Sequence, residues 1–302
     1  MQGKGILVVG YGKLGRRVAH NLSKKHDVIA LKRSPIEQVG KVKMCFADVT
    51  RIENLKEKLP LCVKDGIDYL IYCLSPSEYS KQGYRDAYLT GLQNIIASLP
   101  NTDALKHIIF ISSTSVYHQS NGEEVDELSS CSPSAFSGKV LLEAESYIAG
   151  LNVASTSIRF SGIYGGDRSR LIEKVKHTIE QGEVLEAAPG YTNRIHEDDC
   201  LGFICHLIDL LEHKQELEAC YIGTDSCPVE QAEVYQFIAA QLQGSDHNEQ
   251  AASLSIEETD SAKSKRRAGS KRCKNDRMKQ SAYVLKYTSY KEGYAGLLKG
   301  AK

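Results

Sequence analysis

The chain has 302 residues, long enough for one large α/β domain, alone or with a smaller lobe, and its 41% hydrophobic and 25% charged residues are ordinary for a soluble globular protein. The formal net charge is zero, so no overall field favours nucleic acid or an anionic membrane. No apolar run approaches the roughly 20 residues of a membrane helix, and the N-terminus has no signal-peptide layout.

The nine cysteines form no Cys-x-x-Cys pair, and several lie in apolar segments, as reduced core cysteines do. We therefore expect a cytoplasmic protein. No spacing among the nine histidines suggests a metal site, and we expect none.

A glycine-rich turn follows the first predicted strand. Residues 6–9 are a continuous apolar run, typical of a strand buried on both faces, and residues 13–23 have helical spacing. Between them, Gly10 allows a tight turn, Gly12 lets the backbone approach a pyrophosphate, and Gly15 lets the helix pack on the strand. Because a helix N-terminus binds phosphate through its N–H groups, the turn predicts a dinucleotide site.

The end of the second predicted strand, residues 27–31, indicates which dinucleotide is bound. An acidic side chain about 20 residues after the glycines would bind the ribose 2′-hydroxyl of NAD, whereas arginine suits the 2′-phosphate of NADP. Arg33 occupies this region, followed by Ser34, so NADP is favoured and NAD is the alternative. Lys32 and Arg33 could also be an ordinary solvated strand end.

Further strands are predicted at residues 42–47, 66–74, 107–111, 153–160 and 219–223, and helices at residues 84–99, 137–149, 171–181, 197–211 and 229–242. Strands that alternate with helices predict a parallel sheet with right-handed crossovers. The predicted fold is a Rossmann-type doubly wound α/β sheet with a smaller C-terminal substrate lobe. We place the dinucleotide-binding domain at residues 1–163 and the lobe at residues 164–302, intertwined with the first domain, to whose sheet late segments could return.

The order of these segments resembles the extended short-chain dehydrogenases/reductases of the NAD(P)-dependent epimerase/dehydratase type, over nearly the whole chain. The resemblance lies in the glycine turn, Asp48-Val49, residues 112–117, Lys139 with Glu143, residues 159–165, residues 194–199 and residues 271–275. It implies a cofactor site formed by Gly10, Tyr11, Gly12, Lys13, Leu14, Gly15, Arg33, Ser34, Asp48, Val49, Cys73, Leu74, Ser75, Ser112, Lys139, Phe160 and Ser161. It also implies that Ser113 polarises the substrate oxygen.

One departure from the family pattern bears on the mechanism. In the family, a tyrosine four residues before the lysine lies on the same helix face and moves a proton. Here that position is Ala135, which resembles an atypical branch that lacks the tyrosine. Tyr117 and His196 are candidate substitutes, although a structural role is the stronger interpretation of each.

Two functions therefore remain open. The first is an oxidoreductase or epimerase-like enzyme that acts through bound nicotinamide on a small or nucleotide-sugar-like substrate. The second is a catalytically silent dinucleotide-binding sensor or partner-binding protein. A homodimer is plausible by analogy.

A late basic run, Lys263–Arg267 with Lys271, Arg272 and Lys274, has three interpretations. It could be a solvated loop, a clamp for a phosphate-bearing substrate or a nucleic-acid patch. We favour the solvated loop, and nucleic acid is the least favoured because no aromatic residue is interleaved with the basic ones.

Overall fold

The computed structural model describes residues 3–36, 40–64, 66–166, 170–244, 255–258 and 269–300. The chain forms two compact units. The first unit contains residues 1–116, 131–159 and 201–221, and the second contains residues 117–130, 160–200 and 222–302. Each unit is therefore built from segments that are separated along the chain.

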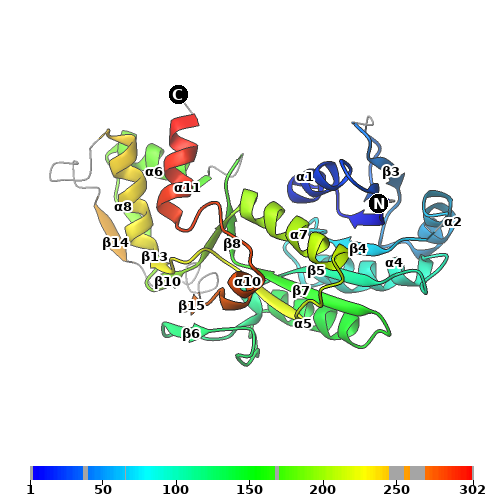
Figure 1. Ribbon diagram of the computed structural model, residues 1–302. Helices are drawn as coiled ribbons and strands as arrows, with labels where there is room; N and C mark the ends of the chain where they lie inside the picture. Colours follow the sequence, from blue (N-terminus) through cyan, green and yellow to red (C-terminus); the bar gives the residue numbers. More distant parts are fainter. Residues whose placement is uncertain are drawn as a thin grey trace. The chain divides into compact units, whose positions relative to one another are not determined.

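A seven-stranded parallel sheet lies at the centre of the first unit, which confirms the Rossmann-type prediction (Figure 1). Its strands lie in the order β12 (Cys220–Gly223), β7 (Ala154–Phe160), β5 (His107–Ser113), β4 (Tyr69–Tyr72), β1 (Gly5–Val9), β2 (Asp27–Lys32) and β3 (Lys43–Phe46). The order reverses between β1 and β4, whose residues pair in register from Ile6 with Tyr69 to Val9 with Tyr72. Such a reversal point is where ligands bind in open parallel sheets.

Helices cover both faces of this sheet because its central strands are buried on both sides. Figure 1 shows α1 and α7 on one face and α4 and α5 on the other. The helices of this unit are α1 (Lys13–Leu22), α2 (Ile52–Cys62), α3 (Lys81–Tyr84), α4 (Gly91–Ser98), α5 (Phe136–Ala149) and most of α7 (Glu197–Glu212). A short turn of 3₁₀ helix, η2 (Thr114–Val116), follows β5.

The helix predicted at residues 84–99 begins earlier and is not uniform. It starts with α3, whose N-terminus is capped by the Ser80 hydroxyl accepting from the Gly83 N–H. A turn of π-helix, η1 (Arg85–Thr90), then joins α3 to α4. Apolar spacing indicates that a helix exists but does not indicate a widened turn within it.

The second unit combines short strand pairs with helices. The pairs are β6 (Glu123–Val125) with β15 (Lys271–Cys273), β8 (Gly162–Tyr164) with β11 (Arg194–His196), β9 (Leu185–Ala187) with β14 (Ile256–Glu258), and β10 (Tyr191–Thr192) with β13 (Val229–Glu230). The helices are α6 (Arg170–Gln181), α8 (Gln231–Leu242), α10 (Asp276–Gln280) and α11 (Tyr290–Gly300).

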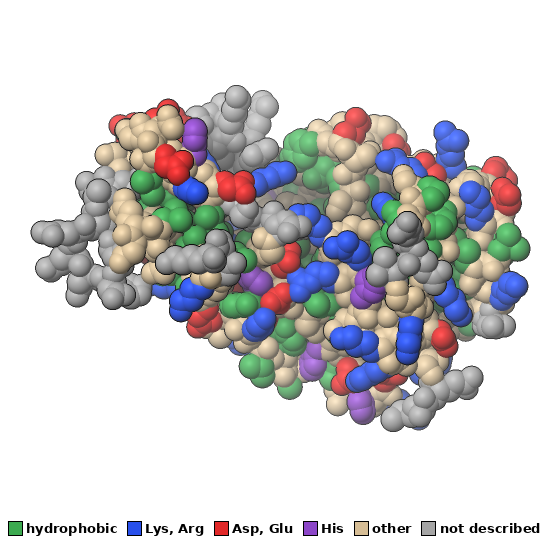
Figure 2. Space-filling view, turned by 90° about the horizontal axis from the view of Figure 1, so that it is seen from above, with side chains coloured by type: hydrophobic (Ala, Val, Ile, Leu, Met, Phe, Trp, Pro, Cys, Tyr) green, Lys and Arg blue, Asp and Glu red, His purple; other side chains and the backbone are tan. Residues whose placement is uncertain are grey.

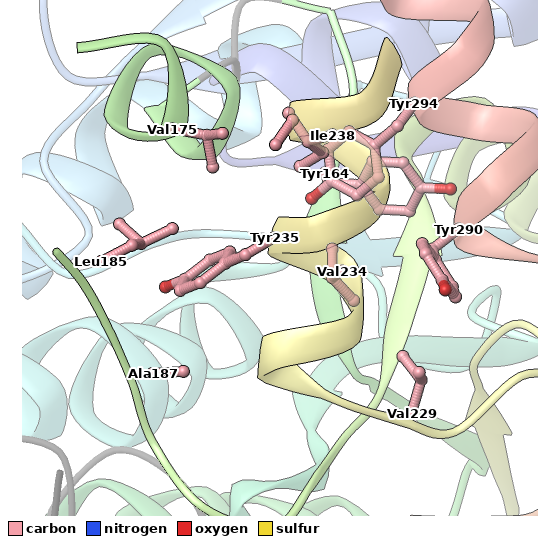
Figure 3. Close-up of a cluster of buried hydrophobic side chains, with 11 residues drawn as sticks. Tyr164, Val175, Leu185, Ala187, Val229, Val234, Tyr235, Ile238, Tyr290 and Tyr294 are labelled. Atoms are coloured by element: carbon pink, nitrogen blue, oxygen red, sulfur yellow. The ribbon is translucent and has the colours of Figure 1, made fainter. Parts of the chain in front are cut away.

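The core of the second unit is rich in tyrosine (Figure 3). The rings of Tyr164 and Tyr294 stack with their centroids 4.6 Å apart. Tyr235 and Ile238 of α8 belong to the same cluster, together with Val175 of α6. A buried phenol usually has a polar partner for its hydroxyl. The Tyr164 hydroxyl is an exception, because it has no hydrogen-bond partner among the described residues.

Charged side chains of both signs lie on the surface. On the face seen in Figure 2, basic and acidic side chains are interspersed, in keeping with the zero net charge. Among the helices in the described part of the chain, none is both long enough and apolar enough to span a bilayer.

Candidate functional site

The turn between β1 and α1 needs its three glycines for different reasons. Gly10 has φ +102°, and a Cβ there would lie 2.7 Å from the backbone of Leu74. A Cβ on Gly15 would lie 1.8 Å from the carbonyl oxygen of Gly10. A Cβ on Gly12 would meet no described atom within 4 Å. Packing of the protein itself therefore requires glycine at positions 10 and 15. The open space beside Gly12 is not needed for that packing and is available to a ligand.

The N-terminus of α1 adjoins this space. Gly12 is its N-cap and makes no side-chain cap, and the first turn contains no acidic residue. The first helical hydrogen bond runs from the Arg16 N–H to the Gly12 oxygen over 2.9 Å, so earlier N–H groups have no acceptor within the helix. Such an end attracts anions through its N–H groups and its dipole.

A pocket of about 300 Å³ opens beside the glycine turn. The residues predicted from sequence that line it are Gly10, Tyr11, Gly12, Arg33, Ser34, Asp48, Val49, Cys73, Leu74 and Ser75. They come from the ends of β1, β2, β3 and β4, which meet at the carboxyl edge of the sheet. The structure thus brings together ten predicted residues from four separate segments of the chain.

The side of the pocket formed by the ends of β2 and β3 is polar and carries both signs of charge. The Asp48 carboxylate accepts hydrogen bonds from the Thr50 N–H (3.0 Å) and the Thr50 hydroxyl (2.8 Å). Burial by itself raises the pKa of Asp48, but the Thr50 hydrogen bonds and the Arg33 and Arg51 charges outweigh burial and leave the pKa below its ordinary value. Asp48 is therefore an ionised acceptor close to a guanidinium.

The opposite wall is the loop that follows β4. The Cys73 thiol donates to the Gly10 oxygen (3.3 Å), and burial raises the pKa of Cys73 to about 12. This thiol therefore holds the back of the glycine turn and is not a reactive group. Asp86 and Ala87, from the π-helical turn η1, also line the pocket, and the Gln82 side-chain amide donates to Asp86 (2.7 Å).

Ser113, Ala135 and Lys139 lie near one another around the start of α5, but none of them lines this pocket. Ala135 is the N-cap of α5, and its oxygen accepts from the Lys139 N–H (3.2 Å). Lys139 is exposed. Ser113 ends β5, and its hydroxyl accepts from the Ser115 N–H (3.2 Å). A Cβ on Gly138 would lie 2.5 Å from the Ser115 oxygen, so the two segments pack closely.

Ser112 is committed to a buried network. Its hydroxyl donates to Glu145 of α5 over 2.5 Å. Arg159 of β7 donates to both oxygens of the same carboxylate, through Nε at 3.2 Å and Nη2 at 2.7 Å. All three side chains are buried, so the network joins α5 to β5 and β7.

Four other predicted residues belong to the second unit, and all are buried: Tyr117, Phe160, Ser161 and His196. The Ser161 hydroxyl donates to the Thr224 hydroxyl over 3.0 Å. His196 Nδ1 accepts from the Asp198 N–H over 3.1 Å, and its ring packs against Tyr164 and Tyr287. Burial lowers the pKa of His196, despite nearby carboxylates that raise it, so this histidine is a packed, neutral side chain.

The remaining predicted residues, Lys13, Leu14 and Gly15, begin α1 behind the pocket lining. Sequence reasoning missed part of the lining: Leu31, Lys32, Ala47, Thr50, Ser77, Gly83, Asp86 and Ala87. Lys32, Ala47 and Thr50 adjoin predicted residues and could have been found from their place at strand ends. Nothing in the sequence indicated that Asp86 and Ala87 line the pocket, because they lie in a π-helical turn that the apolar spacing does not predict.

The basic run lies partly outside the described residues, since only Lys271, Arg272 and Lys274 are described. Lys274 pairs with Glu124 over 2.7 Å. Arg272 donates to the Gly122 oxygen over 2.9 Å and lies over the ring of Tyr191. These side chains thus contact the β6 segment of their own unit. Among the described residues, no group of three or more histidine, cysteine, aspartate or glutamate side chains is arranged to hold a metal ion.

The parallel sheet, the glycine turn and the pocket at the reversal of strand order define a Rossmann-type dinucleotide-binding protein. Residues 6–223 match the model of the NAD dependent epimerase/dehydratase family, and the chain belongs to that family.

Comparison with solved structures agrees with this assignment. A protein from Methylobacillus flagellatus, described as an NAD-dependent epimerase/dehydratase, is 34% identical, with a TM-score of 0.78 over 99% of this chain and 98% of that one. A protein of unknown function from Silicibacter pomeroyi is 22% identical, with a TM-score of 0.73 over 99% of both chains. The Bordetella bronchiseptica enzyme WbmG, solved in complex with NAD, shares the fold at 12% identity, with a TM-score of 0.78 over 99% of this chain and 94% of that one. No curated protein matches the sequence.

Proposed function

We propose that the protein is an NADP(H)-using enzyme of the epimerase/dehydratase type that acts on a nucleotide-sugar-like substrate. The observation that carries the proposal is the pocket in which the α1 N-terminus, Arg33 and Asp48 converge. Each of these groups complements a different part of a dinucleotide, which a general anion site would not require.

The residues of the pocket fit the cofactor in a consistent order. The open space at Gly12 and the N–H groups of α1 accommodate a diphosphate. Arg33 and Ser34 at the end of β2 would hold the 2′-phosphate, and Asp48 with Val49 the adenine. When bound, nicotinamide supplies hydride transfer.

The groups expected to act on substrate lie around the start of α5. Ser113 would donate a hydrogen bond to the substrate oxygen, and the exposed ammonium of Lys139 would bind the nicotinamide ribose. The tyrosine of the family pattern is Ala135 here, so another group or water must move the proton.

The substrate class is suggested by proteins of the same fold. WbmG has been solved with NAD and UDP, and MoeE5 with UDP-glucuronic acid and NAD. A UDP-N-acetylglucosamine 4-epimerase from Bacillus cereus also shares the fold, at 14% identity with a TM-score of 0.72. Uridine diphosphate sugars are therefore the substrates to try first.

Ala135 also favours the second candidate, a catalytically silent protein that binds the dinucleotide and reports its state. The two candidates share the pocket and differ in turnover alone.

Calorimetric titration with NADP⁺ and NAD⁺ tests the cofactor assignment. We expect NADP⁺ to bind more tightly, and we expect Arg33→Ala to weaken NADP⁺ binding by about 10- to 100-fold, since hydrogen bonds to charged groups contribute roughly 1.5–3 kcal/mol. NAD⁺ binding should change by less than about threefold, because NAD⁺ lacks the 2′-phosphate. Lys43→Ala, on the neighbouring strand β3 but outside the pocket lining, is the matched control.

Incubation of the cofactor-loaded protein with a panel of uridine diphosphate sugars, followed by product chromatography, then separates the two candidates. Turnover supports the enzyme. Tight cofactor binding without conversion of any sugar supports the silent protein. Failure to bind either nicotinamide dinucleotide would exclude both.

A further inference from the structure

An aromatic cluster lies against the first turn of α5, outside the set of residues considered so far. Phe136, the first residue of α5, contacts Tyr79 with ring centroids 5.2 Å apart and Tyr84 at 5.4 Å. Tyr79 and Tyr84 contact each other edge to face at 5.5 Å. Two phenols therefore pack directly beside the residue that follows Ala135.

The cluster connects the loop that follows β4 to the helix that carries Lys139. Phe136 and Lys139 are three residues apart on one helix, so they share a face. Tyr79 lies on the loop that follows β4, two residues after Ser77, which lines the pocket. The same loop packs on the glycine turn, where Leu74 closely approaches Gly10. Tyr79 thus belongs to a segment that reaches from the phosphate-binding turn to the start of α5.

Tyr79 differs from the other candidate proton donors in its exposure. Tyr79 is 71% exposed, which is unusual for a large aromatic residue with two ring neighbours, Tyr84 and Phe136. Tyr84 is half-buried, whereas Tyr117 and His196 are only 4% exposed. Of these four residues, Tyr79 is the most exposed, so a ligand in solution reaches its hydroxyl most readily.

We propose that Tyr79 supplies the phenol that position 135 lacks, with its ring held on Phe136 and Tyr84 at the nicotinamide end of the site. The proposal rests on the proposed function. In it, the hydroxyl of Tyr79 gives its proton to the substrate oxygen and becomes a phenolate, and in the reverse direction the phenolate takes the proton that leaves a substrate hydroxyl. The Lys139 ammonium, on the same helix face as Phe136, stabilises the phenolate.

The location of Tyr79 can be tested without a substrate, because the chain contains no tryptophan. Tyr79→Trp introduces a single indole, and an indole in contact with the cationic nicotinamide ring is quenched. We expect the fluorescence of this indole to fall when NADP⁺ is added. It should stay constant when ADP-ribose 2′-phosphate is added, because that ligand lacks nicotinamide. Tyr147→Trp is the matched control, because Tyr147 lies on α5 about three turns after Phe136. Its fluorescence should respond to neither ligand.

Two results would overturn the placement: an equal response of Tyr79→Trp to both ligands, or no response while calorimetry shows NADP⁺ binding. Absence of NADP⁺ and NAD⁺ binding to the wild-type chain would instead overturn the proposed function, so the two failures are distinguishable.

The proton-transfer role is tested on the uridine diphosphate sugar panel. Tyr79→Phe keeps the ring packing and removes the hydroxyl, and we expect kcat to fall by about 10²- to 10⁴-fold with little change in cofactor affinity. Tyr84→Phe removes a hydroxyl from the same cluster and should stay within about threefold of wild type. Wild-type turnover by Tyr79→Phe would overturn the role of Tyr79 in proton transfer. The role would also be overturned if the Tyr79→Trp fluorescence reported contact with nicotinamide while the wild-type protein converted no sugar.

Discussion

At the scale of single residues, the glycine turn separates what the fold requires from what a ligand requires. Gly15 packs against the Gly10 oxygen, while Gly12 has open space where a side chain would be. The sequence pattern predicts a different role for each position, and the structure adds a physical reason: a steric limit at Gly15 and open space at Gly12.

This contrast gives a first prediction. Gly12→Ala should leave the melting temperature within about 2 °C of wild type, because its Cβ meets no described atom, but should abolish measurable dinucleotide binding by filling the space for the diphosphate. Gly15→Ala should lower the free energy of unfolding by about 1–3 kcal/mol or more, since its Cβ would overlap the Gly10 oxygen. Thermal denaturation and calorimetric titration of the two variants measure both effects. Equal loss of stability in both would contradict the assignment.

A second prediction concerns the residue between the first two glycines. The Tyr11 hydroxyl and His20 Nε2 of α1 lie 2.8 Å apart, so the turn is braced to its own helix. Tyr11→Phe should weaken NADP⁺, NAD⁺ and ADP-ribose by the same factor of about 2–10, which corresponds to one hydrogen bond. Arg33→Ala serves as the contrasting variant because it should affect NADP⁺ alone. Unequal effects of Tyr11→Phe on the three ligands would argue against a brace.

Residue roles that follow from backbone geometry could be predicted from sequence, and roles that depend on side-chain partners could not. Gly10 and Gly12 line the pocket as the turn pattern predicts. Ser112 matches a site position, yet its hydroxyl is bound to Glu145, which is 33 residues away. No local pattern of residues signals such a long-range partner.

At the scale of elements, α5 is anchored by charge as well as by apolar packing. Glu145 connects it to β5 through Ser112 and to β7 through Arg159. The helix that presents Lys139 is therefore fixed relative to the strand that ends in Ser113. Preorganisation of these two groups depends on a buried carboxylate six residues after Lys139 on the same helix.

A third prediction tests this anchor. Arg159→Met leaves the Glu145 carboxylate buried without its guanidinium and should lower the free energy of unfolding by about 3–5 kcal/mol. The double variant Arg159→Met/Glu145→Gln removes the unpaired charge and should recover part of that loss. Chemical denaturation of the wild type, the single variant and the double variant decides the matter. A double variant less stable than the single variant would show that the charge pair is not the cause.

Element boundaries were predicted well where apolar periodicity was regular and less well where it was not. Helix α6 begins one residue before its predicted start and ends at Gln181 as expected. The π-helical turn at Arg85–Thr90 was not predicted, because it adds width to a helix without changing which residues are apolar. That turn supplies two residues of the pocket, so the least predictable element contributes directly to the site.

At the scale of the whole molecule, one buried acid makes stability depend on pH. Asp225 is 1% exposed, and burial raises its pKa to about 7, with Asp199 and Glu292 adding to the rise, against the Cys227 N–H bond and Arg194. The pKa of an aspartate in the unfolded state is about 4. Between about pH 4 and pH 7, Asp225 therefore keeps its proton in the folded state and loses it in the unfolded state. Stability from this residue therefore falls as pH rises through that window.

The corresponding prediction is that Asp225→Asn melts at a higher temperature than wild type at pH 8, with a smaller difference at pH 5. The amide oxygen can still accept from the Cys227 N–H, which Asp225 binds at 3.0 Å. Differential scanning calorimetry at both pH values measures the change. A variant that is destabilised equally at the two pH values would mean that ionisation of Asp225 does not control stability here.

The overall architecture could be predicted because alternating strands and helices leave few arrangements of a parallel sheet. The aromatic cluster of Tyr79, Tyr84 and Phe136 could not, since its members come from a loop and two helices whose packing no periodicity reports. Sequence reasoning thus predicted the residues that line the pocket beside the glycine turn better than those around the start of α5, where chemistry is proposed.

The segmental composition of the first unit has a consequence for biosynthesis. Its last segment, residues 201–221, supplies most of α7 and part of the edge strand β12, and it follows two excursions of the chain into the second unit. A nascent chain can pair β1, β2 and β4 early, but it cannot complete this unit until residue 221 has left the ribosome. Until then the outer side of β7 lacks its neighbouring strand, so during translation this edge can pair with another chain.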